Sequence, residues 1–214
     1  RLEFYFNWVK LFAKNIIIPG AIEKSYDKKN VVIHNQINIA KPSSNPELKT
    51  SNEIVIGFIG SLTKHKGFDI FLEILNHSKM HAIVAGKGVL ESRIVNKDNL
   101  SFMGYIDEEQ KKTFYDKIDI LVFPSVVEET FSLVCFEAMF NYIPIVCFNI
   151  GYPSKIVKIF NTGIVSQAMT SDGLFVAIKK CVENRKELSG NCLKVIEKFE
   201  NNNFCKSFSK LFEE

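Results

Sequence analysis

The chain has 214 residues, of which 46% are hydrophobic and 24% charged, and its formal net charge is +3. This length allows one good-sized domain with a buried core, or one domain and part of another. The basic residues are scattered, with isolated pairs such as Lys111-Lys112 as the densest spots, which excludes the basic stripe of a nucleic-acid binder.

The first segment, residues 1–13, carries Leu2, Phe6, Val9 and Phe12 at helical spacing and predicts a helix. A helix packed on both sides is the favoured interpretation. An interfacial helix at a membrane surface stays open, because aromatic residues and Lys10 suit a headgroup layer. No apolar run has the length of a membrane span. The segment has no signal-peptide pattern and no initial Met, so we expect that the sequence starts at an artificial or processed cut in a longer chain.

Two short strands are predicted next, at residues 15–18 and 31–34. Residues 41–52 are polar and contain two prolines and several serines, which is typical of a linker. We therefore expect a domain boundary at 41–52, with residues 1–40 before it.

After the linker, short apolar runs alternate with segments of helical spacing. Asp107 is the expected N-cap of one of these helices. The alternation predicts βαβ units, that is, an α/β fold with a Rossmann-like parallel sheet and helices on both faces. Strands are expected at 53–59, 80–85, 100–103, 118–123 and 144–148, and helices at 68–75, 108–116, 131–141 and 175–183.

The five cysteines are odd in number and form no Cys-x-x-Cys, which indicates buried thiols in a reducing cytosol. The four histidines show no zinc-ligand spacing with them, so no metal is expected.

Ligands of parallel sheets bind at the carboxyl ends of the strands, so we expect the binding residues in the loops that follow the strands. The loop at 60–67 begins at a glycine and leads into a helix, and Lys66 could add a point charge for a phosphate. It matches neither a Walker loop nor Gly-x-Gly-x-x-Gly. Taken by itself, the loop is better interpreted as a solvated basic turn.

The segment at 128–139 is the most informative one. Glu129 lies in a loop, and Glu137 lies inside an otherwise apolar helix, where a carboxylate is costly unless it is bonded. The helix start at 131–134 offers free N–H groups for an anion. Two carboxylates beside an anion site suit a sugar nucleotide. A Glu137 that merely pairs within the core remains an alternative.

The segment resembles the Glu-x7-Glu motif of glycosyltransferase family 4, in which a strand ending in Pro-Ser precedes the motif, as it does here at 119–125. The loop at 60–67 resembles the family's Gly-Arg-Leu…Lys-Gly loop, 85–88 its Gly-x-Gly turn, and 102–105 its Phe-x-Gly segment near the base. These motifs follow one another in the family's order, from about residue 53 to 165. Residues 1–38 resemble the end of the family's first domain.

The resemblance implies the donor-binding, C-terminal half of a two-domain GT-B enzyme that retains anomeric configuration. Its expected domains are an acceptor-domain tail at 1–40, a donor domain at 53–190 and C-terminal helices at 191–214. It implies that Lys66 and Glu129 are the catalytic residues. Lys66 would bind the diphosphate and stabilise it as leaving group, Glu129 would contact the sugar hydroxyls, and Glu137 would hold the ribose. The implied nucleotide-binding set is Gly60, Ser61, Gly86, Met103, Gly104, Tyr105, Phe131, Ser132, Leu133, Val134 and Glu137.

The resemblance further implies a UDP- or GDP-sugar donor, a polysaccharide or glycolipid acceptor, and no cofactor. It also implies that the full-length protein is located in the cytoplasm, with peripheral membrane contact. Without the rest of the first domain, the fragment is expected to bind nucleotide but not to catalyse. Ser61, Ser132 and Lys155 depart from the family's Arg, Gly and Glu. These departures keep open a degenerate scaffold module, and a sugar-nucleotide epimerase of the same fold is a second alternative.

Overall fold

The computed structural model describes residues 16–18, 30–32, 53–94 and 98–200. The first two predicted strands are observed as β1 (Ile16–Ile18) and β2 (Asn30–Val32), which pair in parallel. The predicted helix at 1–13 and the linker at 41–52 lie outside the described residues.

The main body is built on a six-stranded sheet in the order β5-β4-β3-β6-β7-β8, in which every pairing is parallel. The chain starts in the middle of the sheet, at β3, moves outward to β5, returns beside β3 with β6 and proceeds to the other edge. The order therefore reverses between β3 and β6, and such a switch point is where doubly wound sheets bind ligands. The strands are β3 (Val55–Ile59), β4 (His81–Ala85), β5 (Leu100–Phe102), β6 (Ile120–Phe123), β7 (Ile145–Phe148) and β8 (Gly163–Ser166).

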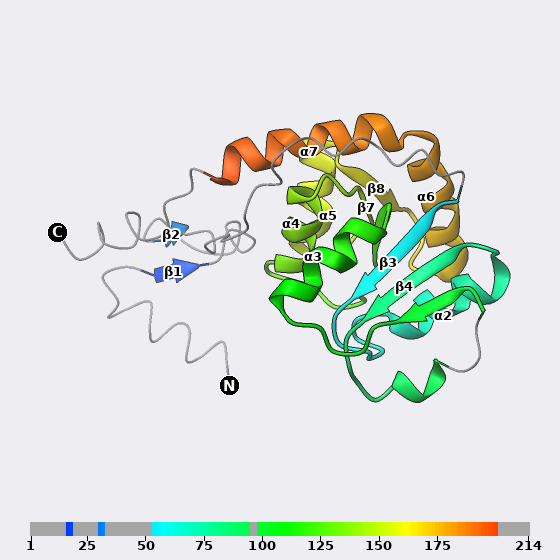
Figure 1. The fold of residues 1–214 in the computed structure, drawn as a ribbon. Helices are drawn as coiled ribbons and strands as arrows, with labels where there is room; N and C mark the ends of the chain where they lie inside the picture. The colour runs from blue at the N-terminus through cyan, green and yellow to red at the C-terminus, as the bar shows by residue number, and fades with distance from the viewer. Residues whose placement is uncertain (1–15, 19–29, 33–52, 95–97, 201–214) are drawn as a thin grey trace.

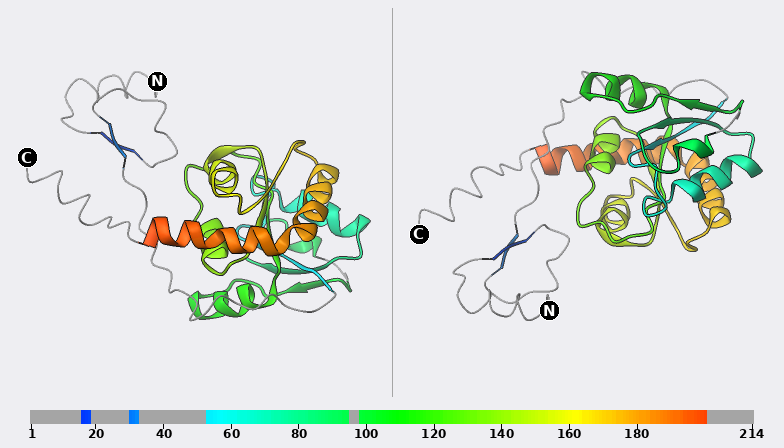
Figure 2. Two further views of the ribbon diagram at one scale, coloured as in Figure 1. Left: turned by 90° about the horizontal axis from the view of Figure 1, so that it is seen from above. Right: turned by 90° about the horizontal axis from the view of Figure 1, so that it is seen from below.

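Helices cover both faces of this sheet (Figures 1 and 2). Residues of α2 and α6 share one buried cluster with one face of the strands, and residues of α3, α4, α5 and α7 share a second cluster with the other face. The predicted Rossmann-like fold is thus confirmed. The helices are α2 (Phe68–His77), α3 (Glu108–Lys117), α4 (Leu133–Phe140), α5 (Gly151–Phe160), α6 (Ser171–Glu183) and α7 (Arg185–Glu200), with a 3-10 turn, η2, at Glu91–Arg93.

Successive side chains of β3 point alternately into the two buried clusters, so both faces of this strand are buried. Ile56 and Phe58 belong to the cluster on the α2 side, and Val55 and Ile59 pack against the other cluster. The Phe58 ring lies 5.0 Å from the ring of Phe68 on α2. An apolar strand of this kind is stable only between two layers, which the helices supply.

Several elements differ from the sequence predictions. Helix α4 begins at Leu133 instead of residue 131, because Ser132 is extended (φ −132°) and acts as the N-cap. Strand β6 begins at Ile120 instead of 118. Helix α5 and strand β8 were not predicted at all. Pro153 and Gly151 obscure α5, although Pro is tolerated in a first helical turn, where its missing N–H has no helical partner.

Helix α7 runs unbroken through residue 190, where the sequence prediction separates the donor domain from C-terminal helices. Its residues Cys192, Val195 and Phe199 belong to the same buried cluster as Phe136 of α4. Residues 185–200 therefore pack as part of this body, while the division of the whole chain into domains stays a prediction.

The predicted cap of α3 gives a first testable expectation. Asp107 accepts a hydrogen bond from the Gln110 N–H (2.9 Å), and the Gln110 side chain accepts one from the Asp107 N–H (3.0 Å), which is a capping box. Replacing Asp107 by Ala is expected to lower the free energy of unfolding by about 1 kcal/mol. Chemical denaturation of both proteins measures this, and an unchanged midpoint would show that the cap contributes nothing.

Candidate active site at the carboxyl edge of the sheet

Three loops interlock where β3, β4 and β5 end. The Gly60 N–H donates to the Ala85 carbonyl (3.0 Å), and the Gly86 N–H donates to the Gly104 carbonyl (2.7 Å). Gly86 has φ +139°, and a Cβ there would lie 1.8 Å from the Gly60 carbonyl oxygen. Only glycine fits this approach. The structure thus brings together Gly60, Gly86 and Gly104, which the sequence placed in one site.

The loop that carries Lys66 is fastened to the loop after β6. Gly67 has φ +68°, and a Cβ there would lie 1.9 Å from the carbonyl oxygen of Pro124. The Val126 N–H donates to the His65 carbonyl at 3.0 Å. The backbone on both sides of Lys66 is therefore fixed against the segment that leads to Glu129.

Lys66 and Glu129 form an ion pair across 63 positions of sequence. The same carboxylate oxygen, Oε1, accepts a hydrogen bond from the Ser125 hydroxyl at 3.1 Å. Side-chain exposures of 35% for Lys66 and 18% for Glu129 leave the pair within reach of a ligand. The two groups predicted to be catalytic are thus neighbours, and Ser125 is a contributor that the sequence analysis missed.

The start of α5 holds the backbone of Glu129. The Tyr152 N–H donates to the Glu129 carbonyl (2.9 Å). Gly151 has φ +67°, and a Cβ there would lie 2.7 Å from the Glu129 nitrogen. The helix that sequence reasoning missed is therefore what positions Glu129.

Helix α4 begins four residues after Glu129, and its N-cap Ser132 makes no side-chain capping bond. The first-turn N–H groups are those of Leu133, Val134 and Cys135, because Phe131 and Ser132 precede the helix. Leu133 is 50% exposed, so this turn reaches the surface. An uncapped helix start carries partial positive charge and suits an anion. Phe131 itself stacks on Phe136, with 4.6 Å between the ring centroids.

Glu137 lies one turn further along α4 and has its own partners on α3. Its Oε1 accepts from the Lys111 Nζ at 2.8 Å, and its Oε2 accepts from the Tyr115 hydroxyl at 2.7 Å. Burial and the charge of Glu137 raise the pKa of Tyr115 well above its ordinary value. Burial alone would lower the pKa of Lys111, but its hydrogen bonds to Glu108 and Glu137 outweigh this and raise it. The hydroxyl and the ammonium group therefore both stay protonated donors at neutral pH.

The segment predicted to border a base follows β5. The Met103 N–H extends the sheet by donating to the Val84 carbonyl (2.9 Å), and Gly104 turns the chain with φ +69°. Tyr105 is 71% exposed, and the Nζ of Lys87 lies 5.0 Å from its ring centroid. An open aromatic face beside a glycine turn could receive a flat ring, and Ser61 is exposed at the same edge.

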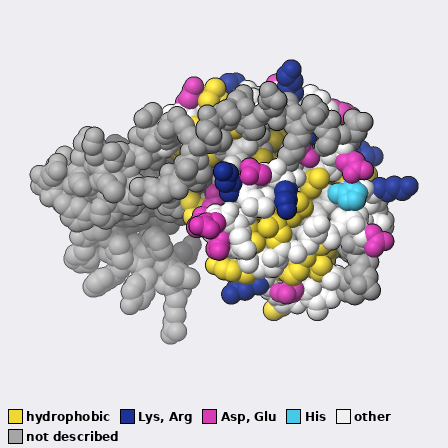
Figure 3. Space-filling model, viewed as in Figure 1, with side chains coloured by type: hydrophobic (Ala, Val, Ile, Leu, Met, Phe, Trp, Pro, Cys, Tyr) yellow, Lys and Arg dark blue, Asp and Glu magenta, His cyan; other side chains and the backbone are white. Residues whose placement is uncertain are grey.

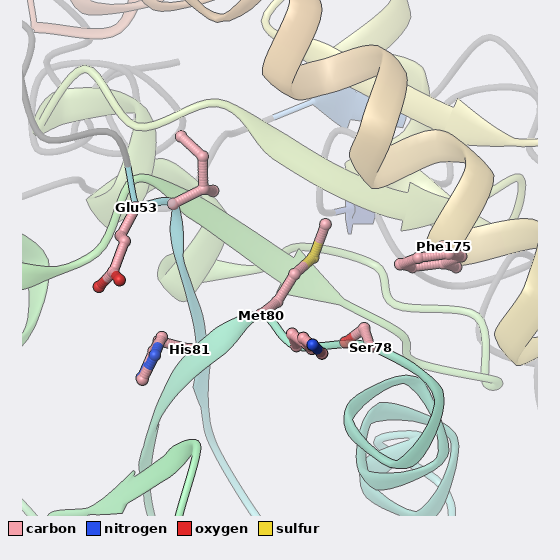
Figure 4. A pocket seen from close by; sticks show the side chains of 7 residues that line it. Glu53, Ser78, Met80, His81 and Phe175 are labelled. Carbon is pink, nitrogen blue, oxygen red and sulfur yellow. The ribbon is translucent and has the colours of Figure 1, made fainter.

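The opposite edge of the sheet carries a shallow hollow of about 410 Å³, in which Met80 and the ring of Phe175 lie between β4 and α6 (Figure 4). Glu53, Ser78 and His81 line it as well, at the amino ends of β3 and β4. No residue predicted for the site belongs to this hollow. Among the described residues on the face shown in Figure 3, positive and negative side chains are interspersed around a hydrophobic band, without a field of one sign.

The comparisons with known proteins decide the family. Residues 40–199, more than half of the chain, match the family described as glycosyl transferases group 1. The chain belongs to this family. It is 25% identical over 177 residues to an uncharacterised glycosyltransferase of Methanocaldococcus jannaschii, which covers 76% of this chain and 45% of that protein. The chain spans less than half the length of the curated relatives it matches.

Solved structures of low identity share the fold. HepE of Anabaena, solved in complex with UDP, superposes with a TM-score of 0.77 at 19% identity, covering 99% of this chain and 66% of HepE. The pneumococcal O-GlcNAc transferase GtfA, in complex with UDP and GlcNAc, superposes with a TM-score of 0.73 at 16% identity, covering all (100%) of this chain and 47% of GtfA.

In the described part of the chain, no helix has both the length and the hydrophobicity of a transmembrane span.

Proposed function

We propose that this group 1 glycosyltransferase chain is the donor-binding, C-terminal domain of a retaining enzyme of glycosyltransferase family 4. It would bind a nucleoside diphosphate sugar at the carboxyl edge of the sheet. The observation that carries the proposal is the Lys66–Glu129 pair beside the uncapped start of α4, because it unites a cation, an anion-binding helix end and a sugar-binding carboxylate.

The proposed chemistry uses each of these groups. When the bond between the anomeric carbon and the phosphate oxygen breaks, negative charge develops on the diphosphate. In this proposal, Lys66 and the N–H groups of Leu133 and Val134 would stabilise that charge. Glu129, held by Ser125, would accept hydrogen bonds from sugar hydroxyls. In the front-side mechanism that the family implies, the acceptor hydroxyl attacks on the departing side, and its proton passes to the leaving phosphate oxygen.

UDP is the preferred donor nucleotide in this proposal, with GDP second. HepE and GtfA, whose folds match, are described in complex with UDP. A polysaccharide or glycolipid acceptor would bind in a preceding domain, and the full-length enzyme would be cytoplasmic, with peripheral contact to the membrane. Transfer would need both domains, so the isolated chain is expected to bind nucleotide without turnover.

Calorimetric titration with UDP, GDP and ADP tests the proposal. Saturable binding of one diphosphate, lost when Glu137 is replaced by Ala, is the expected result. A chain that binds none of the three would contradict it and favour a second candidate, a degenerate scaffold module. The observation behind that candidate is that Ser61 and Lys155 stand where the family has Arg and Glu, and both side chains are exposed.

A further inference from the structure

The feature that the sequence did not anticipate is the way α3 holds Glu137. Lys111 and Tyr115 are four residues apart, so they lie on one face of α3. Lys111 donates to one carboxylate oxygen of Glu137 and Tyr115 to the other, at 2.8 and 2.7 Å. With one donor on each oxygen, the plane of the carboxylate is fixed. The Glu137 side chain is only 12% exposed, so water contributes little to the orientation of its carboxylate.

This arrangement leaves part of the hydrogen-bonding capacity of the Glu137 carboxylate unused. An ionised carboxylate accepts about four hydrogen bonds, and the protein fills two of them here. Each oxygen therefore keeps an acceptor position for an outside donor. The ammonium group of Lys111 also neutralises the carboxylate, which lowers the repulsion that a buried negative charge would exert on an anionic ligand.

Apolar side chains of both helices also contribute to the core. Phe114 of α3 belongs to the same buried cluster as Phe136 and Met139 of α4. Buried ion pairs add little stability beyond what apolar residues would give at the same place. The Lys111–Glu137–Tyr115 cluster thus points to a role in binding.

We propose that Lys111 and Tyr115 are positioning residues that orient Glu137 toward the two neighbouring ribose hydroxyls, so that the site selects a ribonucleotide over its 2′-deoxy counterpart. The proposal rests on the proposed function, because it takes Glu137 as the ribose-binding group. Loss of either donor would let the carboxylate rotate, and the hydrogen bond to the 2′-hydroxyl would weaken.

The experiment compares the dissociation constants of UDP and 2′-deoxyuridine diphosphate by calorimetry. The 214-residue chain is expected to prefer UDP. In Lys111→Gln and in Tyr115→Phe, the preference is expected to fall by about threefold to tenfold, the range for one neutral hydrogen bond. Lys112→Gln is the matched control: Lys112 is exposed on the same helix, turned by about 100° from Lys111, and should leave the preference unchanged.

The outcomes separate the two proposals. A parent chain that binds neither nucleotide refutes the proposed function itself. A parent chain that binds both equally, or variants that keep the full preference while their melting temperatures drop, overturns the positioning role and leaves Lys111 and Tyr115 as structural. A reduced preference in both variants, with unchanged preference in Lys112→Gln, supports it.

Discussion

Replacing Lys66 by Met is expected to weaken the affinity for UDP by about tenfold to a hundredfold, the range for one hydrogen bond to a charged group. Lys66 is the cation of the Lys66–Glu129 pair, and the diphosphate is the most highly charged part of the ligand. The pair is partly exposed, and such pairs stabilise a fold little. The variant should therefore fold normally, so calorimetric titration will report on binding alone.

Two further variants show whether the charge of Lys66 or merely its ion pair matters. Glu129→Gln breaks the pair but keeps the lysine, and it should bind UDP about as well as the parent chain does. Lys79→Met removes an exposed lysine at the opposite edge of the sheet and should change nothing. If Glu129→Gln weakened the affinity for UDP as much as Lys66→Met does, direct binding of the diphosphate by Lys66 would be refuted.

Replacing Asp119 by Ala is expected to lower the free energy of unfolding by about 3–5 kcal/mol, the usual cost of removing one partner of a buried ion pair. Asp119 precedes β6, and its carboxylate binds the guanidinium of Arg185 at the start of α7. Its other oxygen accepts from the Val55 N–H at 2.9 Å, where β3 begins. With side-chain exposures of 3% and 14%, Asp119 and Arg185 join a helix to two central strands away from water.

Denaturant unfolding of Asp119→Ala and of Asp116→Ala measures the effect. Asp116 is exposed near the end of α3, so its loss should change stability by less than about 0.5 kcal/mol. Asp119→Asn keeps an oxygen for the Val55 N–H but loses the charge, and it should fall between the two. An Asp119→Ala protein as stable as Asp116→Ala would show that the Asp119–Arg185 pair contributes nothing.

Much of the fold could be predicted because buried parallel strands are apolar on both faces and end at turn residues. The strand of residues 120–123 stops at Pro124, and the one of 55–59 stops at Gly60. Helix α5 and strand β8 escaped prediction because they lack these signals. Gly151 and Pro153 look like a turn, and β8 is short and starts with Gly163.

The sequence predicted only those site residues that lie in segments with a recognisable pattern of their own. Lys66 and Glu129 could be named because each lies in a recognisable loop, and the structure brings them into contact. Lys111 and Tyr115 could not, because their contact with Glu137 arises only when α3 packs beside α4. The available signal was weak: a lysine and a tyrosine four residues apart on a helix that also carries the buried Phe114.

The most direct measurement of the central claim is a crystal structure of the chain with UDP. The account predicts the nucleotide at the carboxyl edge of the sheet, with its diphosphate between Lys66 and the N–H groups at the start of α4, and with its ribose hydroxyls on Glu137. UDP bound in the hollow lined by Ser78, Met80 and Phe175 at the opposite edge, or bound at the carboxyl edge without touching Lys66 or Glu137, would contradict it.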